Sequence, residues 1–204
     1  MLPRPELQQP SQQASQQKPQ PLQPFELIQL PKELTGQYGA NRFDKKHCQI
    51  SADTDWQAIQ CWLNEFYDSP QTLRNYRKEA ERLLLWSLNQ RNKALSDLGR
   101  EDFQYYQGFL ADPQPSHIWC GPRAERNSAK WRPFKGPLSE NSQRQALIII
   151  NALFSYLVDA GYLAGNPLSL IRRRKRKLQP QADQAISQQR YLDQRTWQLL
   201  KKHL

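Results

Sequence analysis

Six consecutive basic residues near the end of the 204-residue sequence offer its most evident chemistry. Arginine and lysine at this density bind polyanions, because each side chain neutralises a phosphate and releases its counterions. Three roles fit the run: a linker that follows the phosphates of DNA, a patch for an anionic membrane surface, and a nuclear targeting signal. The helical patterns before and after the run favour the linker. The run consists of Arg172, Arg173, Arg174, Lys175, Arg176 and Lys177.

A second group of polar side chains recurs along the stretch 69–91, where Arg74, Lys78 and Arg82 follow one another at intervals of four. At this spacing they form one row on a helix, and with Asn75 they lie opposite the apolar stripe. The grooves of DNA accommodate such a row, whose amide and cationic groups bond base edges and phosphates. The alternative is a solvated charged face, which is the commoner role of charged helix faces.

A third group begins the apolar stretch 139–160. Asn141, Ser142, Arg144 and Gln145 stand in its first turns. Guanidinium and amide groups make the bidentate contacts that distinguish base pairs, and the free N–H groups of a helix N-terminus suit a phosphate. The alternative is that these residues only cap the helix and keep it soluble.

The sequence offers no assembly of catalytic or metal-binding residues. Its three histidines and three cysteines stand at unrelated spacings, without a Cys-x-x-Cys pair. A structural zinc site needs four ligands, and covalent catalysis needs a nucleophile, a base and an orienting group. We therefore expect reduced thiols, no metal, no cofactor and no small-molecule ligand.

The composition indicates a basic protein with a polyanionic partner. Lysine and arginine number 29 against 19 aspartates and glutamates, which gives a formal net charge of +10. No apolar run approaches the roughly 18 to 20 residues of a membrane span, and the N-terminus lacks the pattern of a secretory signal. We expect a soluble, cytoplasmic protein without a membrane partner.

Helical periodicity predicts the elements that must position these groups. We expect helices over 53–67, 69–91, 100–112 and 139–160, with Asp53 or Asp55 capping the first. Ser69 with Pro70, and later Ser139, mark helix starts. The proline-rich, basic stretch 112–138 predicts a long loop that is functional or mobile.

The remaining segments complete the expected domain organisation. Residues 1–24 hold eight Gln and six Pro, a composition that predicts a disordered tail. Residues 25–52 indicate an irregular segment, and 53–170 indicate one helical domain. A basic and then Gln-rich linker follows over 171–189, and 190–204 begin a further amphipathic helix.

The order of these pieces resembles the core-binding domain of tyrosine recombinases, the phage-integrase type of site-specific recombinase. The resemblance covers about residues 53–204 and rests on a Ser/Thr-rich helix start, an aromatic helix end, and a closing Gly–apolar–Asn-Pro turn. WRPFKGPLSENSQRQAL is similar to a bacterial subgroup with a long insertion before the last helix. The matching residues are Ser69, Thr72, Tyr76, Trp86, Gly161, Tyr162, Asn166 and Pro167.

The resemblance implies an all-α, four-helix SAM-like domain that forms half of a clamp on double-stranded DNA. It implies DNA contacts by the second and fourth helices, including Thr72, with the basic run as linker to a catalytic domain that begins at 190–204. It also implies other recombinase protomers as partners and a bacterial, nucleoid-associated location. We expect base contacts from Asn75, Lys78, Arg82, Arg144 and Gln145, with Arg74 on the same face.

The family's catalytic tyrosine and its assisting residues belong to the catalytic domain, and no tyrosine of this sequence stands in a matching context. We therefore expect DNA binding without recombination by this chain alone. A different hypothesis is a helical protein-interaction domain whose basic run binds DNA only non-specifically.

Overall fold

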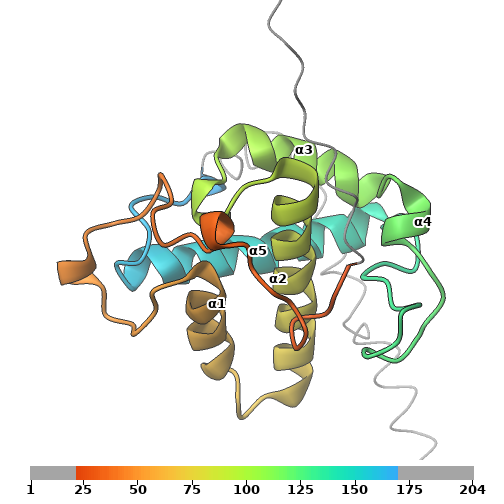
Figure 1. Cartoon of the computed structure of the whole chain (residues 1–204), viewed down its shortest axis with the longest axis horizontal. Helices are drawn as coiled ribbons and strands as arrows, with labels where there is room; N and C mark the ends of the chain where they lie inside the picture. The colour runs from red at the N-terminus through yellow and green to blue at the C-terminus, as the bar shows by residue number, and fades with distance from the viewer. Residues whose placement is uncertain (1–21, 170–204) are drawn as a thin grey trace, which may run out of the picture.

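The computed structural model describes residues 22–169, and within this range every regular element is helical (Figure 1). The chain is therefore all-α in the part described, as predicted. The α-helices are α1 (Asp55–Asn64), α2 (Pro70–Arg91), α3 (Arg100–Ala111), α4 (Ser116–Trp119) and α5 (Glu140–Asp159). Three short 3-10 turns are η1 (Lys32–Leu34), η2 (Lys45–His47) and η3 (Leu95–Asp97).

The helix starts follow from local sequence. Thr54 caps α1, because its side chain accepts from the Gln57 amide while the Gln57 side chain bonds back to the Thr54 amide. The expectation that Asp53 or Asp55 is the cap was wrong. Pro70 occupies the first position of α2, and the Ser139 side chain accepts from the Ser142 amide at the start of α5.

The core forms where α2 and α5 cross. Figure 1 shows α5 running behind α2 at a steep angle, with α3 packed above both. The C-terminal half of α2 is buried from Ala80 to Ser87, because α3, α5 and η3 all surround it. From α5, apolar side chains at spacings of three and four enter the same core: Ala146, Ile149, Ile150, Leu153, Phe154 and Leu157.

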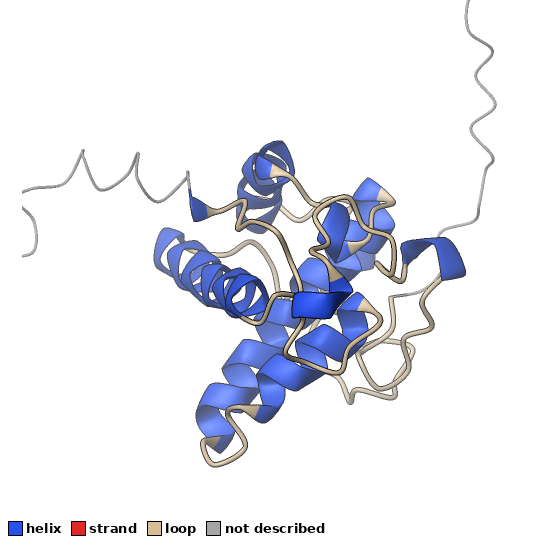
Figure 2. Cartoon of the chain, turned by 90° about the vertical axis from the view of Figure 1, so that its left-hand side faces the viewer, coloured by secondary structure: helices blue, strands red, loops and turns tan. Residues whose placement is uncertain are grey.

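Helix α1 and the N-terminal half of α2 form a hairpin that projects from this core, as Figures 1 and 2 both show. Aromatic stacking joins the two helices, since the rings of Trp62 and Tyr76 are stacked at 5.0 Å. Phe66 packs its edge on Tyr76 at 4.6 Å. The residues that face away from α1 are consequently exposed.

Residues 112–138, which we call the strap, cover one side of α2 rather than forming a free loop. Trp119 and Phe134 are fully buried, and Phe109 of α3 lies between them in edge-to-face contact with both rings. The strap returns on itself through a bridge between Cys120 and Phe134. Aromatic anchors therefore hold in place a segment whose sequence predicted a long functional or mobile loop.

The N-terminal segment also belongs to the folded unit. Leu22 and Phe25 are buried, and the Phe25 ring meets Trp56 of α1 edge-on at 4.5 Å. The expected end of the tail at residue 24 was therefore placed too late, because residues 22–24 already pack on the core. The preceding residues of the expected tail, 1–21, lie outside the described part.

The segment next pairs with the turn after α5, in a contact that we call the clasp. The Asn41 side chain donates to the Gly165 carbonyl at 2.8 Å and accepts from the Gly165 amide at 3.1 Å. The Ala164 amide donates to the Asn41 carbonyl, and the Phe43 amide to the Tyr162 carbonyl. Residues far apart in the sequence therefore close the bundle together.

A buried carboxylate lies beneath the clasp. Asp55 accepts hydrogen bonds from the Ser96 amide and hydroxyl, at 2.9 and 3.0 Å, and from the Tyr162 hydroxyl at 2.9 Å. Burial raises the pKa of Asp55, against the opposing effect of these donors. Gly36 fits against this carboxylate with a φ of +78°, where a side chain would overlap it.

Candidate nucleic-acid interface

The exposed face of the α1–α2 hairpin carries three of the residues predicted to contact DNA. Arg74 and Asn75 are exposed, and a guanidinium nitrogen of Arg74 donates to the Gln71 side chain at 2.8 Å. Lys78 is about half-exposed, with its ammonium 3.0 Å from Glu79. Thr72 is half-buried. The hairpin thus presents cationic and amide groups side by side at its surface.

Arg82 is the exception in the predicted row. Its exposed fraction is only 8%, because the strap covers it. Its Nε donates to the Pro133 carbonyl at 3.0 Å, its guanidinium bonds Glu79, and its plane lies 4.3 Å from the centre of the Phe134 ring. The expectation that Arg82 faces a DNA groove was therefore wrong, and Arg82 instead joins the strap to α2.

Arg144 and Gln145 are exposed on the first turns of α5, as are Asn141 and Ser142. None of the four forms an ion pair among the described residues, and the Ser142 amide is already bonded by the Ser139 side chain. Farther along α5, Asn151 and Ser155 are bonded by the Asn166 side chain and serve to hold the closing turn.

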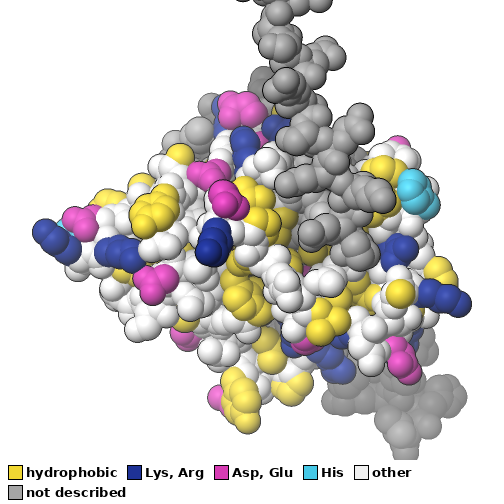
Figure 3. Space-filling model, viewed as in Figure 1, with side chains coloured by type: hydrophobic (Ala, Val, Ile, Leu, Met, Phe, Trp, Pro, Cys, Tyr) yellow, Lys and Arg dark blue, Asp and Glu magenta, His cyan; other side chains and the backbone are white. Residues whose placement is uncertain are grey.

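The basic run Arg172–Lys177 lies outside the described residues, as do the expected linker 171–189 and the expected helix 190–204. The run nevertheless supplies most of the excess positive charge of the chain. Residues 22–169 carry 17 lysines and arginines against 16 aspartates and glutamates, whereas residues 170–204 carry ten against two. Figure 3 shows the two signs interspersed on one face of the described part.

Sequence patterns did not indicate one cluster of charges beside the hairpin. Glu26 accepts hydrogen bonds from Arg77 of α2 and from Arg126 of the strap. Arg126 also bonds Glu81, a buried residue of α2 whose side chain accepts from the Phe25 amide at 2.7 Å. The partners of Glu26 are 51 and 100 residues away in the sequence, so no periodicity could reveal the cluster.

The arginines of the cluster affect the ionisation of Glu26. Partial burial would raise the pKa of Glu26, but the hydrogen bonds and positive charge of Arg126, together with Arg77, lower it. Glu26 is therefore ionised at neutral pH. The cluster contains two arginines and two glutamates and carries no net charge as a whole.

Two absences among the described residues bear on other classes of site. No group of three or more His, Cys, Asp or Glu side chains lies close enough there to hold a metal ion. No helix in the same residues is long and apolar enough to cross a membrane.

Comparison of the chain with known protein families, curated proteins and solved structures finds no match.

Proposed function

We propose that this chain binds double-stranded DNA as the N-terminal, core-binding part of a tyrosine recombinase. One observation carries the proposal: the described domain is nearly balanced in charge, and almost all of the excess positive charge follows it in residues 170–204. A compact domain with a dense basic run immediately behind it suits a protein that combines phosphate binding by the run with positioning by the domain.

The surface of α2 supports the proposal that the domain positions the protein on DNA. Arg74, Asn75 and Lys78 are exposed along the N-terminal half of α2. A helix of this diameter enters the major groove of B-form DNA, and guanidinium, ammonium and amide groups are the donors that bond base edges there. We assign the base contacts of α2 to these three residues and exclude Arg82.

The start of α5 provides a second set of groups of the same kind. Arg144 and Gln145 are exposed and make no ion pair in the described part, so no internal contact must be broken when they bind. An unpaired arginine on a helix surface is available for a guanine or a phosphate. Together with other protomers of the same protein, such a domain would assemble on a recombination site.

The test is selection of bound duplexes from a random DNA pool by the full 204-residue chain, at roughly 50 and 200 mM salt. We expect one short motif to be enriched and affinity to fall about a thousandfold between these salt concentrations, as six to ten phosphate contacts require. Replacing Arg74 and Arg144 by Ala should abolish the enrichment while leaving non-specific binding. The matched control is Lys46→Ala, which removes an exposed lysine that belongs to η2 and to neither α2 nor α5.

Each outcome distinguishes the hypotheses. Binding without an enriched motif, lost when Arg172–Lys177 are replaced by Gln, would favour a helical protein-interaction domain with a non-specific basic run. Absence of binding at 50 mM salt would refute the DNA-binding proposal altogether.

A further inference from the structure

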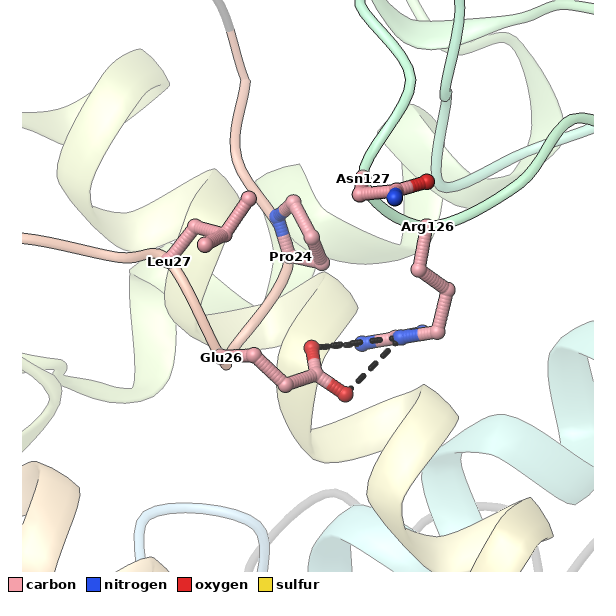
Figure 4. Close-up of a pocket in the computed structure, with 5 residues that line it drawn as sticks. All are labelled: Pro24, Glu26, Leu27, Arg126 and Asn127. Carbon is pink, nitrogen blue, oxygen red and sulfur yellow. Dashed lines mark hydrogen bonds and ion pairs between the residues drawn. The ribbon is translucent and has the colours of Figure 1, made fainter.

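Two arginines hold the Glu26 carboxylate with a geometry that also suits a phosphate. Arg126 bonds it with two nitrogens, Nε at 3.0 Å and a terminal nitrogen at 2.8 Å (Figure 4). A terminal nitrogen of Arg77 donates to the same carboxylate. This forked geometry is the one by which arginines recognise both carboxylates and phosphates. Figure 4 shows Glu26 and Arg126 approaching each other from two different segments. Both residues line an open pocket of about 220 Å³.

Arg77 and Arg126, which together hold Glu26 and which we call the clamp, adjoin the surface proposed to contact DNA. Arg74 and Arg77 are three residues apart on α2, so their side chains are neighbours on one face of the hairpin. Arg123 and Lys130 of the strap add two exposed cations on either side of Arg126 in the sequence. A phosphate backbone that runs past Arg74 therefore meets the clamp next.

Glu26 can leave the clamp without dismantling the fold. The side chains of Glu26, Arg77 and Arg126 are 42%, 39% and 44% exposed, so the contact lies at the surface. Ion pairs at this exposure contribute little net free energy, and a competing anion can replace one partner. Arg126 would stay in place, because buried Glu81 holds it from beneath.

The charge of the clamp also suits a phosphate. With Glu26 displaced, Arg77 and Arg126 face the single remaining charge of Glu81, which leaves a net charge of +1. A phosphodiester carries one negative charge and presents oxygens that accept from the same guanidinium groups. It can therefore substitute for the carboxylate with the same charge and the same donors.

We propose that Arg77 and Arg126 form a binding site for a DNA backbone phosphate, and that Glu26 of the N-terminal segment occupies this site when the protein is free. The inference rests on the proposed DNA binding and adds to it an internal competitor. The N-terminal segment thereby weakens binding to any duplex until a phosphate displaces its carboxylate.

The experiment compares Glu26→Gln with the wild type in the full 204-residue chain, by titrating a fluorescent duplex of about 30 base pairs at salt concentrations from roughly 50 to 200 mM. We expect the variant to bind about fivefold more tightly at 50 mM salt. The slope of log affinity against log salt should be steeper for the variant, because in the wild type salt also weakens the internal Glu26 pair with which the phosphate competes. Glutamine has nearly the shape of glutamate, so the segment should stay packed.

The matched control is Glu33→Gln. It removes the same charge from the same segment, and Glu33 is exposed and forms no ion pair among the described residues. A second variant, Glu26→Gln with Arg77→Gln, should return affinity and salt slope to the wild-type values. Arg77 is preferable to Arg126 here because it contacts no buried glutamate, and thermal unfolding of each variant checks that it is folded.

Two results would overturn the inference in distinguishable ways. If the wild type binds DNA and Glu26→Gln behaves as Glu33→Gln does, the clamp takes no phosphate and the proposed function stands. If neither the wild type nor any variant binds at 50 mM salt, both proposals fail together.

Discussion

At the scale of single residues, Arg74 and Arg82 show that two side chains at regular helical spacing can have different surroundings. Both belong to the same row on α2, two helical turns apart, and they were expected to act alike. Arg74 is exposed and bonds only Gln71, whereas Arg82 lies under the strap with its donors directed to Pro133 and Glu79. The first is free to bind a ligand, and the second stabilises the fold.

This contrast leads to a pair of opposite expectations. Arg82→Ala should lower the free energy of unfolding by about 3 kcal/mol, because it leaves the buried Glu79 carboxylate with Lys78 alone. Arg74→Ala should change it by less than about 0.5 kcal/mol but weaken DNA binding. Urea denaturation and DNA titration of both variants check this, and equal stability of the two would contradict the assignment of Arg82.

Asp102 provides an expectation for pH. Its buried carboxylate accepts from Arg91 and Lys93, each at 2.8 Å, and from the Gly99 amide at 2.9 Å. Burial would raise the pKa of Asp102, but Lys93, the Gly99 amide and Arg91 lower it below its ordinary value of 3.8. The carboxylate therefore stabilises the fold above about pH 4, and this stabilisation is lost as pH falls through the lowered pKa.

Asp102→Asn should consequently cost about 2 kcal/mol at pH 7 and distinctly less at pH 3. The measurement is urea denaturation of the wild type and the variant at both pH values. Their difference cancels contributions from other carboxyls, including that of Asp55, whose raised pKa acts in the opposite sense. A difference that does not depend on pH would show that the charge of Asp102 contributes nothing.

At the scale of elements, the long helices were predictable and the covering segments were not. Caps and apolar spacings of three and four residues are local, so α2 and α5 follow directly from the sequence. The strap has no period, and its docking depends on Trp119 and Phe134 meeting Phe109 of another element. The error over Arg82 has the same origin, since a helical wheel does not reveal which face a distant segment will cover.

The candidate interface likewise contains residues that helical spacing predicts and residues that it does not. The exposed positions of Arg74, Asn75 and Arg144 follow from their places opposite apolar stripes. The clamp around Glu26 does not, because it joins three segments whose proximity arises only in the folded chain. Long-range ion pairs leave no repeating signal in a sequence.

The docking of the N-terminal segment can be tested with two neighbouring residues. Phe25→Ala should lower the free energy of unfolding by about 3 kcal/mol, because Phe25 is 2% exposed and packs on Trp56. Leu27→Ala should have an effect below about 0.5 kcal/mol, since Leu27 is 49% exposed. Chemical denaturation of both variants measures the difference, and similar values would mean that the segment does not contribute to the fold.

At the scale of the whole molecule, the apolar core and the excess positive charge lie in different parts of the chain. The described domain has a net charge of +1 and a continuous apolar core, whereas residues 170–204 have a net charge of +8. Charge repulsion within the domain is consequently small, and the attraction for polyanions is concentrated behind it.

Replacing Arg172–Lys177 by Gln should therefore separate the two properties. DNA affinity at 50 mM salt should fall by at least a hundredfold, because up to six phosphate contacts are removed. The midpoint of thermal unfolding should stay within about 2 °C of the wild type, as the core is unchanged. A large loss of thermal stability would show that the run also supports the fold.

The clasp lies on the path by which tension from the C-terminal side would enter the domain. If the chain binds DNA through residues beyond Ser169, as proposed, tension on that side enters the domain at the turn that follows α5. It is carried first by buried Leu168 and by the hydrogen bonds of the Asn166 side chain to Asn151 and Ser155 of α5. The hydrogen bonds of Asn41 with Gly165 and Ala164 come next. Rupture of the clasp would therefore release residues 41–43 from this turn, while Phe25 and Glu26 keep the start of the N-terminal segment packed.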